Sequence, residues 1–238
     1  MKIRIKFAKS GAMRFIGHLD VMRYFQKAIR RAEIDVAYSE GFSPHQIMSF
    51  AAPLGVGLSS HGEYMDLEVN SCTSSEEMKE RLNQVMVPGM EILNVTLLEE
   101  KEKNAMASVA AAEYSVSFRE GHEPSFPWTE RLMEFYRKPS IPITKKTKKS
   151  ELEMDLKPSV FSLSLSAEDT PVPVIHMLVD ASSSGNIKPA MLLNAFLAEN
   201  GEELSEFALE ITREETFTNR GSAEAPVFVP LDKVGSVF

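Results

Sequence analysis

The clearest structural signals of this chain are concentrated in residues 14–66, which read RFIGHLDVMRYFQKAIRRAEIDVAYSEGFSPHQIMSFAAPLGVGLSSHGEYMD. From about Leu19 the apolar residues recur at steps of three and four, which predicts an amphipathic helix. A turn rich in Gly, Ser and Pro follows, and the stretch ends in alternating apolar and polar residues that are typical of a half-buried strand. The stretch therefore predicts a helix, an exposed turn and a strand in succession.

The residues on either side extend this pattern. Residues 2–9 alternate apolar side chains with Lys and Arg, which predicts a first strand with one buried and one basic face. Downstream, Ser74 offers a cap for a second helix, Pro88-Gly89 stops that helix, and residues 90–98 alternate as a strand. The resulting order, β-α-β-β-α-β, is that of a ferredoxin-like domain.

The same order starts again after a charged and alanine-rich connector. Strands are expected over 114–118, 174–180 and 207–217, helices from Trp128 and Pro189, and extended segments between 141 and 165. We therefore predict an α+β protein made of two tandem ferredoxin-like (β-α-β-β-α-β) domains. The expected boundaries are a first domain at 1–100, a linker at 101–112, a second domain at 113–217 and a tail at 218–238.

Composition limits the classes of function. The chain has 238 residues, of which 43% are hydrophobic and 25% charged, as in ordinary globular proteins. Its net charge of -8 argues against a protein that coats nucleic acid by bulk charge, but it leaves room for local basic patches. Because Cys72 is the single cysteine, and no signal-peptide core or membrane-spanning run is present, we expect a cytoplasmic protein.

Common cofactor motifs are missing from the sequence. Gly55 and Gly57 lack the third glycine and the helix of a dinucleotide-binding loop, and no GxxxxGK[ST] segment occurs. The five histidines show no metal-ligand spacing. We therefore expect neither a metal nor another cofactor.

Two histidines are the candidate catalytic residues, because imidazole titrates near neutral pH. His18 stands at the start of the first helix, two residues before Asp20. Side chains two apart on a helix point to different sides, so Asp20 is interpreted as a first-turn carboxylate that stabilises the helix. For His18 the structural and the catalytic roles both stay open, and His45 is the second candidate.

The turn from Tyr38 to His45 combines two aromatic residues with Ser, Gly and Pro. Exposed aromatic rings beside polar groups are typical of surfaces that stack a base and contact a phosphate. The alternative is a turn in which Tyr38 and Phe42 are core residues. The sequence does not decide between the two.

Two groups of basic residues could bind an anionic ligand. The helix carries Arg23, Lys27 and Arg30 on its polar side, with Arg14 just before it; these could equally form a solvated face. Four lysines, Lys145, Lys146, Lys148 and Lys149, occur within five positions, where they either protect a strand edge or bind an anion.

The segments over 7–57, 62–69 and 144–158, which contain RFIGHLD, GFSPH, GEYMDLEV and TKKTKKSELEMDLKP, resemble the radical SAM-associated (radical SAM-linked) proteins. Members of that family are fused behind, or encoded beside, B12-binding-type radical S-adenosylmethionine proteins in bacteria. The resemblance implies a radical SAM enzyme as partner and transfers no catalytic residue. Since a radical SAM cluster needs three cysteines, a chain with Cys72 alone would be the stand-alone accessory form.

These observations lead to three hypotheses. The first is a non-catalytic accessory protein that recognises RNA, either tRNA or rRNA, for a radical SAM enzyme, with the basic residues on the backbone and Tyr38 and Phe42 stacked on bases. The second is a metal-independent endoribonuclease of the CRISPR RNA-processing type, whose tandem ferredoxin-like fold is similar, with His18 or His45 as general base. The third is a pure protein-protein adaptor.

Overall fold

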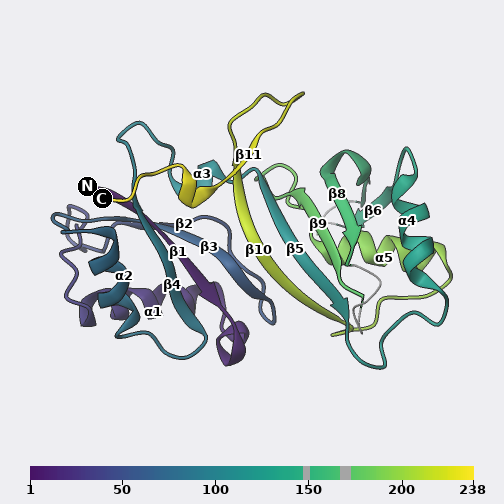
Figure 1. The fold of residues 1–238 in the computed structure, drawn as a ribbon, viewed down its shortest axis with the longest axis horizontal. Helices are drawn as coiled ribbons and strands as arrows, with labels where there is room; N and C mark the ends of the chain where they lie inside the picture. Colours follow the sequence, from purple (N-terminus) through teal and green to yellow (C-terminus); the bar gives the residue numbers. More distant parts are fainter. Residues whose placement is uncertain (147–150, 167–172) are drawn as a thin grey trace. The chain divides into compact units, whose positions relative to one another are not determined.

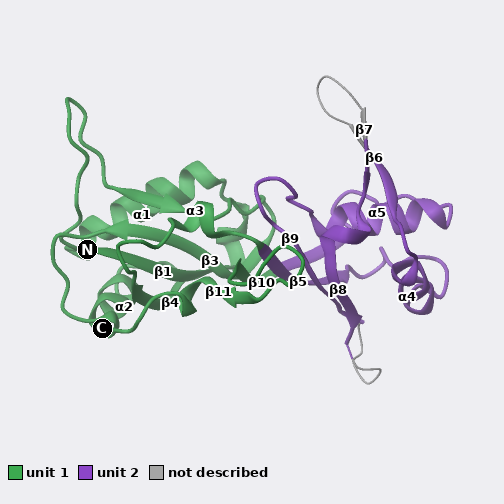
Figure 2. Ribbon diagram, turned by 90° about the horizontal axis from the view of Figure 1, so that it is seen from above, with its two compact units in different colours: residues 1–110, 213–238 green, residues 111–212 purple. Residues whose placement is uncertain are grey.

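The computed structural model describes residues 1–146, 151–166 and 173–238, with the backbone alone described at 145, 146, 151 and 152. The chain is a mixed α+β protein with two compact units (Figure 2). Unit 1 consists of Met1–Ala110 and Arg213–Phe238, and unit 2 of Ala111–Thr212. Residues 213–238, expected as the last strand of the second domain and a tail, thus belong to the same unit as the N-terminus.

Unit 1 contains the predicted succession of elements (Figure 1). Its sheet has the order β4-β1-β3, each pair antiparallel, and both β2 and β10 pair with β3. The helix expected from Leu19 is confirmed as α1. In chain order the elements are β1 (Lys2–Lys9), η1 (Gly11–Phe15), α1 (His18–Arg31), β2 (Met48–Phe50), β3 (Ser59–Glu68), α2 (Ser75–Asn83), β4 (Met90–Leu97), α3 (Ala105–Ser108), the end of β10 (Leu209–Asn219), β11 (Phe228–Pro230) and η3 (Leu231–Lys233).

Helices α1 and α2 pack on one face of this sheet and form the main core of unit 1. Ile3, Ile5 and Phe7 project from β1 into that core, where Phe7 meets Phe25 of α1 edge-on at 4.7 Å between ring centroids. The Ser74 cap of α2 is confirmed, because its side chain accepts a hydrogen bond from the Glu77 amide at 3.2 Å. This face agrees with the apolar alternation of residues 2–9.

The other face of β1 departs from the expectation of a solvent-facing basic side. Arg4 is fully buried, and its guanidinium donates to the Asp66 carboxylate at 2.8 and 3.0 Å. It also donates to the backbone carbonyls of Lys103 and Leu231. The segments that carry these two carbonyls cover the sheet at Arg4. The alternation in the sequence therefore predicted the two faces of β1, but not that other segments cover the basic face.

The last residues of the chain are packed against unit 1. The Phe238 amide donates to Ser75 Oγ at 3.2 Å, and the Ser75 amide donates to the Phe238 carbonyl at 2.9 Å. Ser236 forms a β-bridge with Leu97 at the end of β4. The C-terminal segment therefore closes over β4 and the start of α2.

Unit 2 repeats the succession with one addition, a separate two-stranded sheet of β6 and β7. Its larger sheet has the order β10-β5-β9-β8, to which β10 contributes residues 209–212. Helices α4 and α5 supply Trp128, Leu132 and Phe196 to its core. In chain order the elements are β5 (Ala111–Phe118), α4 (Trp128–Arg137), β6 (Pro142–Lys146), β7 (Glu151–Asp155), η2 (Lys157–Ser159), β8 (Val160–Leu165), β9 (Ile175–Asp180), α5 (Pro189–Glu199) and the start of β10.

Candidate functional site

Helix α1 presents a row of cations to solvent. It buries Val21, Phe25, Ala28 and Ile29, which lie on one side of the helix. Residues spaced by three or four lie on the same side of a helix, so the exposed Arg23, Lys27 and Arg30 form one line on the opposite side. Arg23 pairs with Asp20 at 3.4 Å, but both side chains are about two-thirds exposed, so solvent screens the pair.

The turn after α1 is a short hairpin, which we call the 38–46 hairpin. Tyr38 bridges Gln46, and the Ser39 amide donates to the His45 carbonyl at 2.8 Å. Gly41 has a φ of 108° near the tip, a conformation that favours glycine. Phe42 beside it is fully exposed and Tyr38 is 50% exposed, so neither is a core residue.

A buried side chain joins the hairpin to the helix. Gln46 is 5% exposed, and its Nε2 donates to the Gln26 carbonyl in the middle of α1 at 3.3 Å. Arg30 Nε donates to the same carbonyl at 3.2 Å. The base of the 38–46 hairpin is therefore attached to the middle of α1, at a carbonyl that Arg30 of the cationic row also contacts.

The two candidate histidines have different surroundings. His45 is exposed, and its Nδ1 lies 2.8 Å from Ser39 Oγ, which also accepts from the His45 amide at 3.1 Å. His18 is half-buried, with its ring edge-on to Phe50 at 5.3 Å. His45 thus helps to build the hairpin, while His18 packs against the core at the start of α1.

Next to His18 lies a buried charged cluster of Lys9, Glu63 and Arg213, which the sequence pattern did not predict. Lys9 Nζ donates to the Ile16 carbonyl at 2.9 Å, and burial lowers the Lys9 pKa, while the nearby Glu63 charge opposes that shift. Glu63 pairs with Arg213 at 3.1 Å. His18, Lys9 and Glu63 line a cavity of about 10 Å³, which holds one water molecule at most.

The remaining predicted RNA-binding residues are Arg14 and the four lysines Lys145, Lys146, Lys148 and Lys149. Arg14 lies in η1 with its guanidinium 4.8 Å from the Phe15 ring centroid, a cation–π contact. Lys145 and Lys146 lie in β6 of unit 2, where only their backbone is described, and Lys148 and Lys149 lie outside the described residues. The structure therefore joins the helix cations to the hairpin within unit 1, and the four lysines belong to unit 2.

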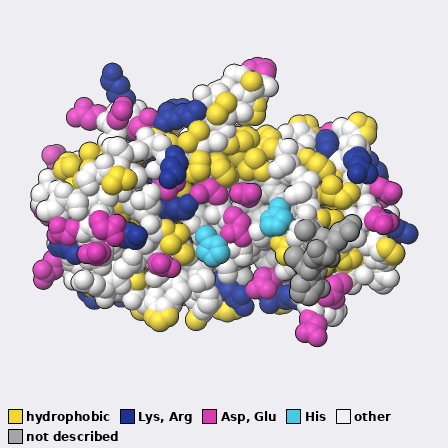
Figure 3. Space-filling view, viewed as in Figure 1, with side chains coloured by type: hydrophobic (Ala, Val, Ile, Leu, Met, Phe, Trp, Pro, Cys, Tyr) yellow, Lys and Arg dark blue, Asp and Glu magenta, His cyan; other side chains and the backbone are white. Residues whose placement is uncertain are grey.

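Charge is mixed on the face of the molecule drawn in Figure 3, where Lys and Arg side chains lie among Asp and Glu. This agrees with the net charge of -8. Among the described residues, no group of three or more His, Cys, Asp or Glu side chains is arranged to hold a metal ion. None of the helices in the described part of the chain is both long and apolar enough to cross a membrane.

Comparison with solved structures gives a likeness of fold. A chain in the "Crystal Structure of a Cbf5-Nop10-Gar1 Complex" superposes with a TM-score of 0.50 at 10% sequence identity. The match covers 90% of this chain and 48% of the other, so this chain spans about half the length of that neighbour. At this identity the likeness concerns the fold alone.

Comparison of sequences places the chain in a family. None of the curated proteins matches it. A model of the family described as "Uncharacterized protein conserved in bacteria" matches residues 2–189, which include α1, the 38–46 hairpin and the buried charged cluster up to Glu63. The chain therefore belongs to this bacterial family, DUF2344.

Proposed function

We propose that this chain is an accessory protein that recognises RNA, either tRNA or rRNA, for a radical SAM enzyme. The observation that carries the RNA part is the fully exposed Phe42 on a hairpin fastened to the cationic side of α1. Stacking of a base on an aromatic side chain contributes about 1–3 kcal/mol. Arg23, Lys27 and Arg30, which are exposed on α1, would then neutralise the adjoining phosphates.

The geometry favours single-stranded or looped RNA as the ligand. A ring that projects from a hairpin tip reaches only bases that are unstacked, as in loops and bulges. The row of three cations along α1 would follow the backbone on either side of such a base. The net charge of -8 makes broad coating of a duplex unfavourable, so a short contact is expected.

The partner part of the proposal is supported by sequence. The segments over 7–57, 62–69 and 144–158 resemble radical SAM-associated proteins, and Cys72 alone cannot hold the cluster that such chemistry needs. The chain would then supply recognition and leave the reaction to its partner. A lone cysteine also agrees with the reducing cytoplasm, where we place this pairing.

We also propose that both units are ferredoxin-like. In unit 1 the order β4-β1-β3-β2 supports this assignment, with an α-helix before β2 and another after β3. In unit 2 the order β10-β5-β9-β8 supports it in the same way. The β6-β7 hairpin is then an insertion after the first helix of the second domain.

Binding of fluorescently labelled single-stranded RNA and of a total tRNA pool, followed by anisotropy at several salt concentrations, tests the RNA proposal. Replacing Phe42 with Ala should weaken binding about 5- to 150-fold through the lost stacking. The triple change Arg23→Gln, Lys27→Gln, Arg30→Gln should reduce the slope of log affinity against log salt by about 2, because three single-strand phosphate contacts are lost.

A matched control removes three exposed lysines elsewhere in unit 1, Lys101, Lys103 and Lys233, with the same change in net charge. They lie in the segments over the opposite face of the sheet, so this variant should keep most of the affinity. Equal losses in both triple variants would mean that only bulk charge attracts RNA. Absence of saturable binding by the unaltered chain would remove the proposal.

The metal-independent ribonuclease is the second candidate, favoured by the exposed His45 in the same hairpin as Phe42. A His positioned next to a stacked nucleotide could take the proton of its 2′-hydroxyl. RNA cleavage in the presence of chelator, lost in a His45→Ala variant that still binds RNA, would replace the accessory role by an enzymatic one. Cleavage that persists in that variant would indicate a contaminating nuclease or another base, such as His18.

A further inference from the structure

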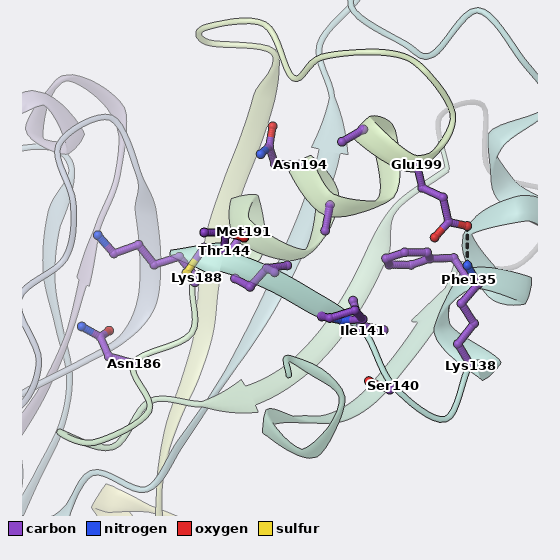
Figure 4. Close-up of a pocket in the computed structure, with 14 residues that line it drawn as sticks. Phe135, Lys138, Ser140, Ile141, Thr144, Asn186, Lys188, Met191, Asn194 and Glu199 are labelled. Carbon is purple, nitrogen blue, oxygen red and sulfur yellow. Dashed lines mark hydrogen bonds and ion pairs between the residues drawn. The ribbon is translucent and has the colours of Figure 1, made fainter. Parts of the chain in front are cut away.

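Unit 2 contains a groove that has no part in the proposed binding of RNA by unit 1. It has a volume of about 850 Å³ and lies between α5 and the segment that leads from the end of α4 into β6 (Figure 4). Apolar side chains form much of its wall, with Phe135 and Ile141 on one side and Met191 and Ala195 on α5. Lys138 and Lys188 lie toward its two ends.

One wall of the groove is the outer edge of β6, which pairs with no strand other than β7 in the described part of the chain. Ile143 pairs with Met154 and Thr144 with Glu153 in the antiparallel β6-β7 hairpin. The Leu156 amide donates to the Ile141 carbonyl at 2.9 Å, so the hydrogen-bonded positions of this ladder are the odd ones. The backbone N–H and C=O of Thr144 therefore point away from β7.

This edge faces the groove. Pro142, Ile143 and Thr144 of β6 line it, whereas no described residue of β7 does. An isolated two-stranded hairpin is marginally stable in water, and a third strand would stabilise it. Over Pro142–Thr144 the outward groups are the Pro142 carbonyl and the N–H and carbonyl of Thr144, because proline has no N–H. Another extended polypeptide can satisfy these groups in register, as in strand addition.

The opposite wall suits the side chains of such a peptide. Met191, Ala195 and Ala198 follow one another on α5 at steps of four and three, so they present one side of the helix to the groove. Two of the three are alanines, which leaves room for apolar side chains from the incoming strand. The charged residues among the described lining are two cations, Lys138 and Lys188, and one carboxylate, Glu199, which pairs with Lys138.

We propose that unit 2 binds an extended segment of a partner protein in this groove, as a third strand beside β6. The segment carries apolar side chains at alternate positions, which contact α5, and acidic residues toward its ends, which meet Lys138 and Lys188. This proposal does not depend on RNA binding by unit 1.

A library of random short linear peptides, displayed on phage and selected on the immobilised full chain, tests the proposal. Selected peptides are then synthesised with a fluorescent label and titrated by anisotropy. They should alternate apolar residues, carry acidic ends and bind saturably. Replacing Thr144 with Pro removes the outward N–H without breaking the hairpin, and should weaken binding up to about tenfold; Thr144→Val keeps that N–H and should bind normally.

One further variant and one modified ligand test the groove without a change in the backbone of the β6-β7 hairpin. Ala198→Trp places a large ring on the exposed side of α5 and should abolish binding by filling the groove. Peptides N-methylated at alternate residues should lose affinity for the unaltered chain. The proposal is overturned if no peptide is selected, if peptides bind Thr144→Pro and Ala198→Trp as they bind the unaltered chain, or if Ala198→Trp impairs RNA binding instead.

Discussion

At the scale of single residues, Asp66 holds together segments that are far apart in the sequence. Its carboxylate accepts from Arg4 at 2.8 and 3.0 Å and from the Ala105 amide at 2.6 Å. Both charged side chains are almost fully removed from water. A buried pair of this kind adds little over an apolar replacement, but loss of one partner leaves the other charge uncompensated.

We expect Asp66→Ala to lower the free energy of unfolding by about 3–5 kcal/mol, because Arg4 would remain buried without its counter-ion. Urea unfolding followed by circular dichroism measures the change. Glu68→Ala is the matched control, since Glu68 is exposed on the same strand, and it should change stability by less than about 0.5 kcal/mol. Similar losses in both variants would show that the pair is not the cause.

The residues of the candidate site were predictable to different degrees. Helical spacing was enough to place Arg23 and Lys27 on one side of α1, and the Gly, Ser and Pro content of residues 39–44 was enough to predict a turn. The exposure of Tyr38 and Phe42 was not predictable from the sequence. Lys9 and Glu63 were missed, because charged residues in an alternating strand are expected to face water. The partner of the buried Glu63 is Arg213, which comes from a segment far away in the sequence and reaches Glu63 because β10 lies beside β3.

At the scale of elements, Tyr64 joins three parts of unit 1. From β3 its hydroxyl donates to Glu215 of β10 at 2.6 Å and to Asp232 of η3 at 3.2 Å. Burial is the main cause that raises the Tyr64 pKa, and the two carboxylates raise it further. The neutral phenol is therefore strongly favoured in the folded state.

This predicts a loss of stability at high pH. Above the usual tyrosine pKa of about 10, the unfolded chain releases the Tyr64 proton while the folded chain retains it, so unfolding becomes more favourable by up to about 1.4 kcal/mol per pH unit. Below that pH the contribution is fully present. Urea titrations across this range should be steeper for the unaltered chain than for Tyr64→Phe; parallel curves would contradict the assignment.

The helices and strands were predictable from local sequence patterns, whereas the pairing of the strands was not. The extended segments expected between 141 and 165 are present as β6, β7 and β8, and η2 (Lys157–Ser159) separates β7 from β8. The α2 cap at Ser74 is confirmed in the same way. Periodicity and caps are properties of neighbouring residues, whereas the position of β10 beside β3 results from packing between segments at opposite ends of the chain.

At the scale of the whole molecule, the order of elements predicted two similar halves, and the structure divides the chain into two compact units. The division is not sequential, because residues 213–238 complete the unit that contains the N-terminus. Hydrogen bonds such as that from Arg4 to the Leu231 carbonyl fix this return and have no local signature in the sequence. Each unit has its own candidate binding surface, which is the 38–46 hairpin with α1 in unit 1 and the groove beside β6 in unit 2.

Ultraviolet cross-linking of bound RNA, with the modified peptides identified by mass spectrometry, tests whether the 38–46 hairpin contacts RNA. We predict nucleotide adducts on Tyr38 and Phe42, with further adducts confined to α1, and loss of the hairpin adducts when Phe42 is replaced by Ala. Adducts located mainly in other parts of the chain, or unchanged by that replacement, would contradict the assignment of the 38–46 hairpin as the RNA-binding surface.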